Sequence, residues 1–176
     1  KDQTVNNYKN AEAVLRRITQ HKPEHKVKAI LDIGAADGKN LSFYRDKAYS
    51  TANCYAIEPS ENCKSQIIDK NLIFLSSDVN DNWEERLSEK FDLVVMRHVL
   101  EHFLEPQIVL RKIHEALSEQ GLLYIAVPNS LNPRGSISSF YFRAAHTFYF
   151  NFHSLSKLLL SNGFKIGLIQ EGDDYN

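Results

Sequence analysis

Six residues, RHVLEH at 97–102, form the densest group of chemically active side chains in the sequence. If a helical turn begins here, His98, Glu101 and His102 fall at positions i, i+3 and i+4 and share one face. Such imidazole and carboxylate groups can accept a proton or bind a metal ion. H-x-x-E-H is also a zinc-protease signature, but that motif needs a sustained helix, and here an apolar run ends one residue earlier. Acid–base chemistry, metal binding and a structural role all remain open.

A second group of polar residues follows three apolar runs. Asp32 ends the first run and is followed by a turn of small residues between Gly34 and Gly38, while Glu58 and Asp78 follow the next two runs. Small residues let the backbone approach a ligand closely, and a helix that starts after the turn offers free N–H groups. The spacing is not the G-x-G-x-x-G of a dinucleotide site, and the turn alone could serve packing. Three acids at successive strand ends favour a nucleoside site, with Glu58 placed for a ribose diol.

The elements that must position these groups alternate between strand and helix. An amphipathic helix is expected at 4–20, and the apolar runs lack polar alternation, which is typical of strands buried on both faces of a parallel sheet. A helix at 106–118 has Pro106 in its first turn and Gly121 after its end, and a helix at 155–162 has Ser154 as its expected N-cap. Strands are predicted at 27–33, 54–58, 72–76, 91–96, 122–127 and 164–169. This order predicts an α/β fold, a Rossmann-like doubly wound and mostly parallel sheet with helices on both faces.

Composition narrows the class of protein. The 176 residues carry 43% hydrophobic and 24% charged residues with a formal net charge of -1. A near-neutral chain does not favour nucleic acid as a partner, and no apolar stretch is long enough for membrane insertion. The two cysteines make neither a disulfide framework nor a C-x-x-C site. We expect a cytoplasmic protein whose residues 1–176 form a single domain, a piece of a longer chain.

Five segments in order resemble the class I S-adenosylmethionine-dependent methyltransferases over residues 8–169: LDIGAADG, AIEPS, SSDV, FDLVVMRHVLEHFLEP and LRKIHEALSEQGLLYIAVPN. The resemblance implies an enzyme that uses S-adenosyl-L-methionine as its cofactor and methylates a small molecule, with an oxygen atom as the expected acceptor. The residues implied in cofactor binding are Asp32, Gly34, Ala35, Ala36, Gly38, Glu58, Pro59, Asp78, Val79, Arg97 and His98. The chain departs from the family at Ala36, where a second glycine is usual, and in ending before the family's seventh, antiparallel strand.

The resemblance also bears on the histidines. Removal of a hydroxyl proton needs a base, and we nominate His98 first and His146 second as catalytic residues. Some ubiquinone-pathway and small-RNA O-methyltransferases bind a metal through an E-x-x-E-H stretch here, and the segment HTFYF at His146 is similar to one that supplies a further histidine in the RNA enzymes. Because His98 replaces the first glutamate, we expect no metal. Glu101 and His102 are then expected to orient a loop and cap a helix.

The long connection 128–153 is expected to form part of the acceptor pocket. It is rich in aromatic residues, which suit an aromatic or sugar acceptor, although we expect at least half of the rings to close the core. These are Phe140, Tyr141, Phe142, Phe148, Tyr149, Phe150 and Phe152, with Arg143 and His146 among them. Two rival functions remain, a non-catalytic methyltransferase-like module of a larger assembly and a nicotinamide-dependent oxidoreductase. The sequence does not indicate an oligomeric state.

Overall fold

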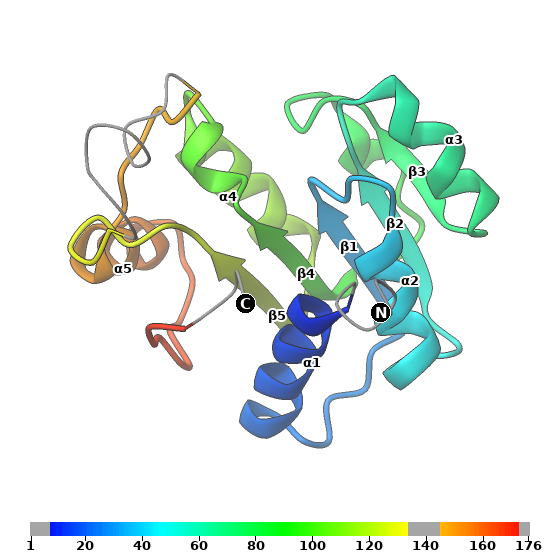
Figure 1. Ribbon diagram of the computed structural model, residues 1–176, viewed down its shortest axis with the longest axis horizontal. Coiled ribbons are helices and arrows are strands. Elements are labelled where there is room, and N and C mark those ends of the chain that lie inside the picture. Colours follow the sequence, from blue (N-terminus) through cyan, green and yellow to red (C-terminus); the bar gives the residue numbers. More distant parts are fainter. Residues whose placement is uncertain (1–7, 134–144, 173–176) are drawn as a thin grey trace, which may run out of the picture.

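Five of the predicted strands form one parallel sheet with the order β3-β2-β1-β4-β5 in the computed structural model, which describes residues 8–133 and 145–172 (Figure 1). The strands are β1 Ala29–Ile33, β2 Asn53–Ile57, β3 Ile73–Ser76, β4 Phe91–Arg97 and β5 Leu117–Ala126. Consecutive parallel strands need a crossover, and helices supply these crossovers. The predicted α/β fold class is therefore confirmed.

Helices cover both faces of the sheet. They are α1 Lys9–His21, α2 Lys39–Ala48, α3 Glu61–Asp69, α4 Pro106–Ala116 and α5 Phe152–Ser161, with the 3₁₀-helices η2 Trp83–Arg86 and η3 Leu100–His102. One apolar cluster joins the sheet to α1, α2 and α3, and a second joins it to α4 and α5. Within the described ranges, no helix is long and apolar enough to cross a membrane.

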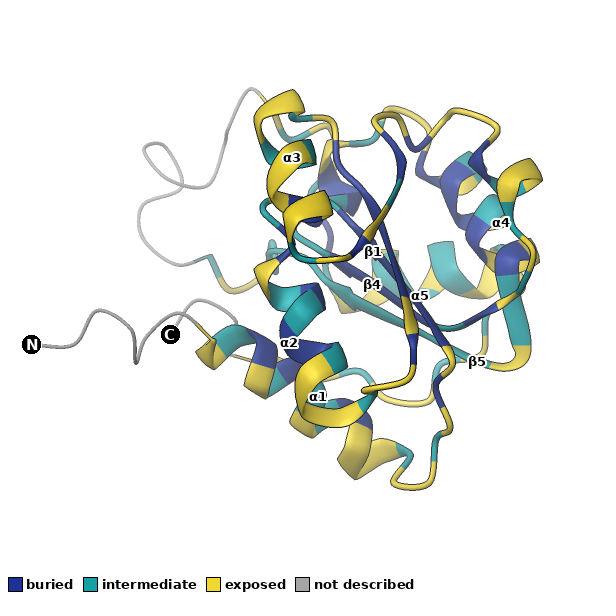
Figure 2. Cartoon of the chain, turned by 90° about the vertical axis from the view of Figure 1, so that its right-hand side faces the viewer, coloured by how far each residue is buried: buried dark blue, intermediate teal, exposed yellow. Residues whose placement is uncertain are grey.

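The central strands explain why their sequences lack polar alternation. All five residues of β1 are buried, and so are four consecutive residues of β4, which Figure 2 shows in dark blue. Because helices pack on both faces, side chains that point to either side of these strands enter apolar layers. Cys54 of β2 is a free thiol buried in one of these layers.

The sheet reverses its winding direction between β1 and β4. From β1 the chain builds outward through β2 and β3, then returns to place β4 on the other side of β1. In the parallel register Ile33 lies beside both Ile57 and Met96, so the carboxyl ends of β1, β2 and β4 meet at one edge. Ligands of doubly wound sheets bind at this reversal point.

Several helix boundaries differ from the prediction. The first helix, predicted at 4–20, is Lys9–His21, and residues 4–7 lie outside the described residues. The helix predicted at 106–118 ends at Ala116, because Leu117 already pairs with Phe91 of β4, and Gly121 lies inside β5. The last helix begins at Phe152, and its N-cap is Asn151, not Ser154. Ser154 is instead the third helical residue of a capping box, in which the side chains of Asn151 and Ser154 accept hydrogen bonds from each other's backbone N–H.

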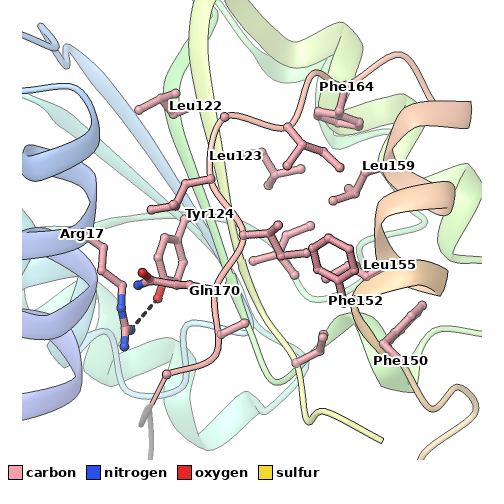
Figure 3. A pocket seen from close by; sticks show the side chains of 18 of the residues that line it. Arg17, Leu122, Leu123, Tyr124, Phe150, Phe152, Leu155, Leu159, Phe164 and Gln170 are labelled. Atoms are coloured by element: carbon pink, nitrogen blue, oxygen red, sulfur yellow. Dashed lines mark hydrogen bonds between the residues drawn. The ribbon is translucent and has the colours of Figure 1, made fainter. Parts of the chain in front are cut away.

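The prediction of a strand at 164–169 is wrong. This segment forms no strand, and a cavity lies between it and β5 (Figure 3). An apolar run becomes a strand only when a neighbouring backbone takes up its N–H and C=O groups. Among the described residues, no strand lies beyond β5 to do so.

Candidate functional site

The turn between β1 and α2 depends on two glycines with left-handed backbone. Gly34 has φ 76° and Gly38 has φ 75°. A Cβ atom at Gly34 would overlap Cγ2 of Val99, and one at Gly38 would lie 2.7 Å from Leu72. The chain therefore needs glycine at both positions. Because these residues have no side chains, the backbone of the turn is uncovered at the sheet edge where ligands of this fold bind. The close approach of Val99, just after β4, was not foreseen from the sequence.

Glu58 ties this turn to the end of β2. Its Oε2 accepts a hydrogen bond from the N–H of Ala36 at 2.8 Å, and its Oε1 accepts one from the N–H of Ser60 at 2.9 Å. Ala36 has φ 48°, a left-handed conformation that an alanine adopts only at a cost. Each carboxylate oxygen keeps capacity for one further hydrogen bond. Glu58 is thus held in place and can still accept hydrogen bonds from a pair of hydroxyls.

Asp32 is an unusual acid at the centre of this edge. It is 5% exposed, and burial raises its pKa to about 7, an effect that the nearby Arg97 opposes and Glu58 reinforces. Desolvation without a full charge partner disfavours the ionised carboxylate. A cationic group bound nearby would stabilise that carboxylate and lower its pKa.

The third acid lies farther out. Asp78 is exposed, and its Oδ1 accepts hydrogen bonds from the backbone and side-chain nitrogens of Asn80, whereas Val79 beside it is buried. Asp81, which the sequence did not single out, accepts a hydrogen bond from Ser76 at 2.9 Å and pairs with Arg86. These two contacts lower the pKa of Asp81. They fix the loop that carries Asp78 and Val79.

His98 stands where β4 ends. Its φ is 53°, and its N–H donates to the carbonyl of Ala126 at 2.8 Å, which holds it against β5. Left-handed backbone at a non-glycine residue is strained and is common at functional sites. The Nδ1 atom of His98 lies 3.9 Å from Oε1 of Glu101, whose pKa is raised by burial. The helical face expected for His98, Glu101 and His102 does not form, because His98 precedes η3 and has a left-handed backbone.

The structure also brings His146 next to His102. Their ring centroids are 5.0 Å apart, and Nδ1 of His102 lies 2.8 Å from the carbonyl oxygen of Ala145. His146 also lies near Tyr149, with 5.9 Å between the ring centroids. The spacing of residues alone does not predict that these segments meet, although the resemblance of HTFYF to a histidine-supplying segment implied it. Their juxtaposition is a property of the fold.

A cavity of about 1680 Å³ is lined by this histidine group at one end and runs along the outer side of β5 toward α1. Figure 3 shows its part between β5, α5 and α1. His98 lines it, whereas the other predicted cofactor residues, all of them described, do not. Leu123 of β5, Leu155 and Leu159 of α5 and Phe164 line its apolar part, and Arg17 donates a hydrogen bond to the hydroxyl of Tyr124 at 3.0 Å on the α1 side. His98 thus lies between the cofactor edge and the cavity.

The aromatic residues of the connection divide into two groups. Phe150 is buried and lines the cavity, while Phe148 and Phe152 are exposed. Residues 140–143, with three more rings and Arg143, lie outside the described residues. Phe152 lines the same cavity, so both Phe150 and Phe152 could contact an apolar acceptor.

Comparison with known proteins identifies the family. The sequence profile of the methyltransferase-domain family matches residues 6–168. The chain belongs to this family. The match confirms the class I S-adenosylmethionine-dependent methyltransferases as the family indicated by the sequence. No curated protein sequence matches the chain.

Solved structures share the fold at low sequence identity. The plantazolicin methyltransferase BamL, in complex with a triazolic desmethylPZN analog and SAH, is 16% identical with a TM-score of 0.72, and the alignment covers 91% of this chain and 63% of BamL. A SAM dependent methyltransferase from Archaeoglobus fulgidus is 21% identical with a TM-score of 0.69, covering 88% and 69% of the two chains. The related plantazolicin enzyme BpumL is covered over 64% of its length. The chain thus spans just under two thirds of the two plantazolicin enzymes.

Proposed function

We propose that this protein binds S-adenosyl-L-methionine at the carboxyl ends of β1, β2 and β3 and transfers its methyl group to an oxygen atom of a small molecule in the cavity beside β5. The observation that carries the proposal is the arrangement of Asp32, the bare turn at Gly34 and Glu58 at the reversal point of the sheet, next to His98. Family membership and the SAH complex of BamL agree with this donor.

The residues present fit the donor. Glu58 is oriented by two backbone N–H groups and keeps acceptor capacity for both ribose hydroxyls. Asp32 and the turn at Gly34 flank the expected methionine part, where the ionised Asp32 carboxylate can pair with a cationic group of the donor. Val79 offers a buried apolar contact to the adenine ring, and Asp78 a hydrogen-bond acceptor for its amino group. The other implied contacts are Ala35, Ala36, Gly38, Pro59 and Arg97.

When bound, the donor supplies a methyl group that its sulfonium already activates. The protein must therefore align an acceptor atom with that methyl group, and orientation can account for about 7–11 kcal/mol of such a barrier in favourable cases. His98 is placed to accept the proton of an acceptor hydroxyl, and Glu101 at 3.9 Å stabilises the imidazolium that results. The apolar residues of the cavity wall, such as Leu123 and Leu159, would contact the acceptor.

The donor is tested by thermal unfolding with S-adenosyl-L-methionine, its demethylated product or NAD. A ligand at a hundred times its Kd stabilises the folded state by about 2.7 kcal/mol. The first two ligands should raise Tm and NAD should not. A response to NAD alone would overturn the proposal, and a Tm raised by none of the three would favour the non-catalytic module.

The role of His98 is tested by His98→Ala, with His153→Ala on the exposed side of α5 as its matched control. Methyl transfer from labelled donor is measured to paired acceptors that differ only in carrying a hydroxyl or an amine. We expect His98→Ala to lower turnover on the hydroxyl acceptor by about a hundredfold or more while donor affinity stays within about twofold. Unchanged turnover in His98→Ala would refute the role of His98 as the base. Transfer to the amine acceptor alone would refute oxygen as the methylated atom.

A further inference from the structure

Glu101, His102 and His146 form a compact group at the mouth of the cavity. One nitrogen or oxygen ligand atom from each residue lies within 4.8 Å of the others. Glu101 and His102 are neighbours in η3, whereas His146 comes from the end of the long connection. All three residues line the cavity beside His98. A single bound ion could therefore contact the three side chains and still be reached from the cavity.

Backbone hydrogen bonds hold the two segments together. The N–H groups of Thr147 and Phe148 both donate to the carbonyl of Glu101, at 2.8 and 3.1 Å. The hydroxyl of Thr147 donates to the carbonyl of His102 at 3.3 Å, and His102 in turn bonds to the carbonyl of Ala145. The segment at 145–148 is thus fastened to η3 on both sides of His146. These hydrogen bonds hold the backbones that carry the three side chains in a fixed relative position.

Glu101 gives an independent sign of a missing partner. Its side chain is 2% exposed, and its Oε2 atom accepts no hydrogen bond from any described residue. A buried carboxylate with an unsatisfied oxygen is costly, and such groups in proteins are paired or coordinate metals. The imidazole of His98, 3.9 Å away, faces the other oxygen. A metal ion bound at Oε2 would give this carboxylate its second partner.

His102 is prepared to act as a ligand. A carbonyl oxygen can only accept, so the Nδ1 atom of His102 must carry the proton that bonds to Ala145. In the neutral ring this leaves the lone pair on Nε2. Metal-binding histidines are oriented in this way, with one ring nitrogen donating to a carbonyl and the other facing the metal.

We propose that Glu101, His102 and His146 bind one divalent transition-metal ion of the zinc type, with open coordination positions toward the cavity. Two imidazoles and one carboxylate suit Zn²⁺ and similar ions, whereas Mg²⁺ and Ca²⁺ prefer oxygen ligands. The assignment replaces the expectation of no metal and makes His146 a ligand instead of a base. It differs from the E-x-x-E-H pattern because His98 is not among the ligands. The same ion would also bind the acceptor oxygen, a step that rests on the proposed function.

The test is calorimetric titration of Zn²⁺ into tag-free protein that has been stripped with a chelator, followed by the same titration with Mg²⁺. We expect one equivalent of Zn²⁺ to bind with a Kd in the micromolar range or below, and no heat from Mg²⁺. His102→Ala and His146→Ala should each weaken Zn²⁺ binding by about tenfold or more, and Glu101→Gln likewise. His153→Ala, which removes an exposed histidine outside the group, should leave the affinity unchanged.

Two further measurements keep the test decisive. Circular dichroism and Tm establish that each variant is folded, and Co²⁺ in place of Zn²⁺ gives a visible absorption band that His102→Ala should abolish. Absence of Zn²⁺ binding in the wild type, or full affinity in folded His102→Ala, would overturn the metal site. Donor affinity, measured in the same samples, should not change in His102→Ala. Absence of donor binding in the wild type would instead count against the proposed function and leave the metal result to stand alone.

Discussion

Replacing Asp32 with asparagine should stabilise the folded chain, and more so at high pH. The folded-state pKa of Asp32 is about 7 and its ordinary value is 3.8, because burial disfavours the carboxylate. Between these values the folded state holds a proton that the unfolded state has released, so rising pH lowers the stability of the wild type. At 1.36 kcal/mol per pKa unit, the cost is about 1.7 kcal/mol at pH 5 and about 4 kcal/mol at pH 8. It is absent below the unfolded-state pKa.

Asp32→Asn keeps the shape and removes the charge, so its stability advantage over the wild type should grow by about 2.5 kcal/mol from pH 5 to pH 8. The measurement is urea unfolding of both proteins at several pH values. The matched control is Asp46→Asn, which removes a carboxylate that is 61% exposed on α2 and should change the stability by less than about 0.5 kcal/mol. An advantage that is constant with pH, or that shrinks as pH rises, would refute the reasoning. The same Asp32→Asn protein should bind S-adenosyl-L-methionine more weakly, because it loses the charge beside the cationic ligand.

Three further variants test local conformations. Ala36→Gly should relieve left-handed strain at φ 48° and raise the free energy of unfolding by about 1 kcal/mol in urea titrations; a loss would show that the turn prefers alanine. Asn151→Ala should remove the cap of α5 and lower stability by about 1 kcal/mol, whereas an unchanged unfolding midpoint would contradict the capping box. Gly34→Ala should lower the free energy of unfolding by about 1–3 kcal/mol, and adding Val99→Ala should recover part of that loss. An equal loss in the double variant would show that Val99 is not what excludes a side chain at Gly34.

The central strands could be predicted because local sequence decides them. Runs such as the one ending at Asp32 are apolar on both sides, and only a sheet covered on both faces accommodates them. Their order along the chain then determines which acids share an edge. The strand expected at 164–169 fails for the complementary reason, since its formation depends on a neighbouring backbone that no local pattern reveals.

The site was predictable in part for the same reasons. Asp32, Glu58 and the glycine turn follow from strand ends in a doubly wound sheet. The approach of His146 to His102 does not follow from strand ends, and only the resemblance of the HTFYF segment implied it. It depends on hydrogen bonds between segments that are distant in the sequence, such as the bond from His102 to Ala145. The buried and unsatisfied oxygen of Glu101 likewise becomes visible only once the packing is known.

Calorimetric titration of S-adenosyl-L-methionine into the wild type and Glu58→Gln tests the central claim most directly. Glutamine keeps one carbonyl oxygen for the two backbone N–H groups that Glu58 now satisfies, and it loses the charge that strengthens hydrogen bonds to ribose hydroxyls. Hydrogen bonds to charged groups contribute about 1.5–3 kcal/mol, so the affinity should fall by about tenfold or more. Glu61→Gln, at the start of α3, should bind like the wild type. A wild type that binds no donor, or equal affinity in Glu58→Gln, would contradict the assignment of the donor site.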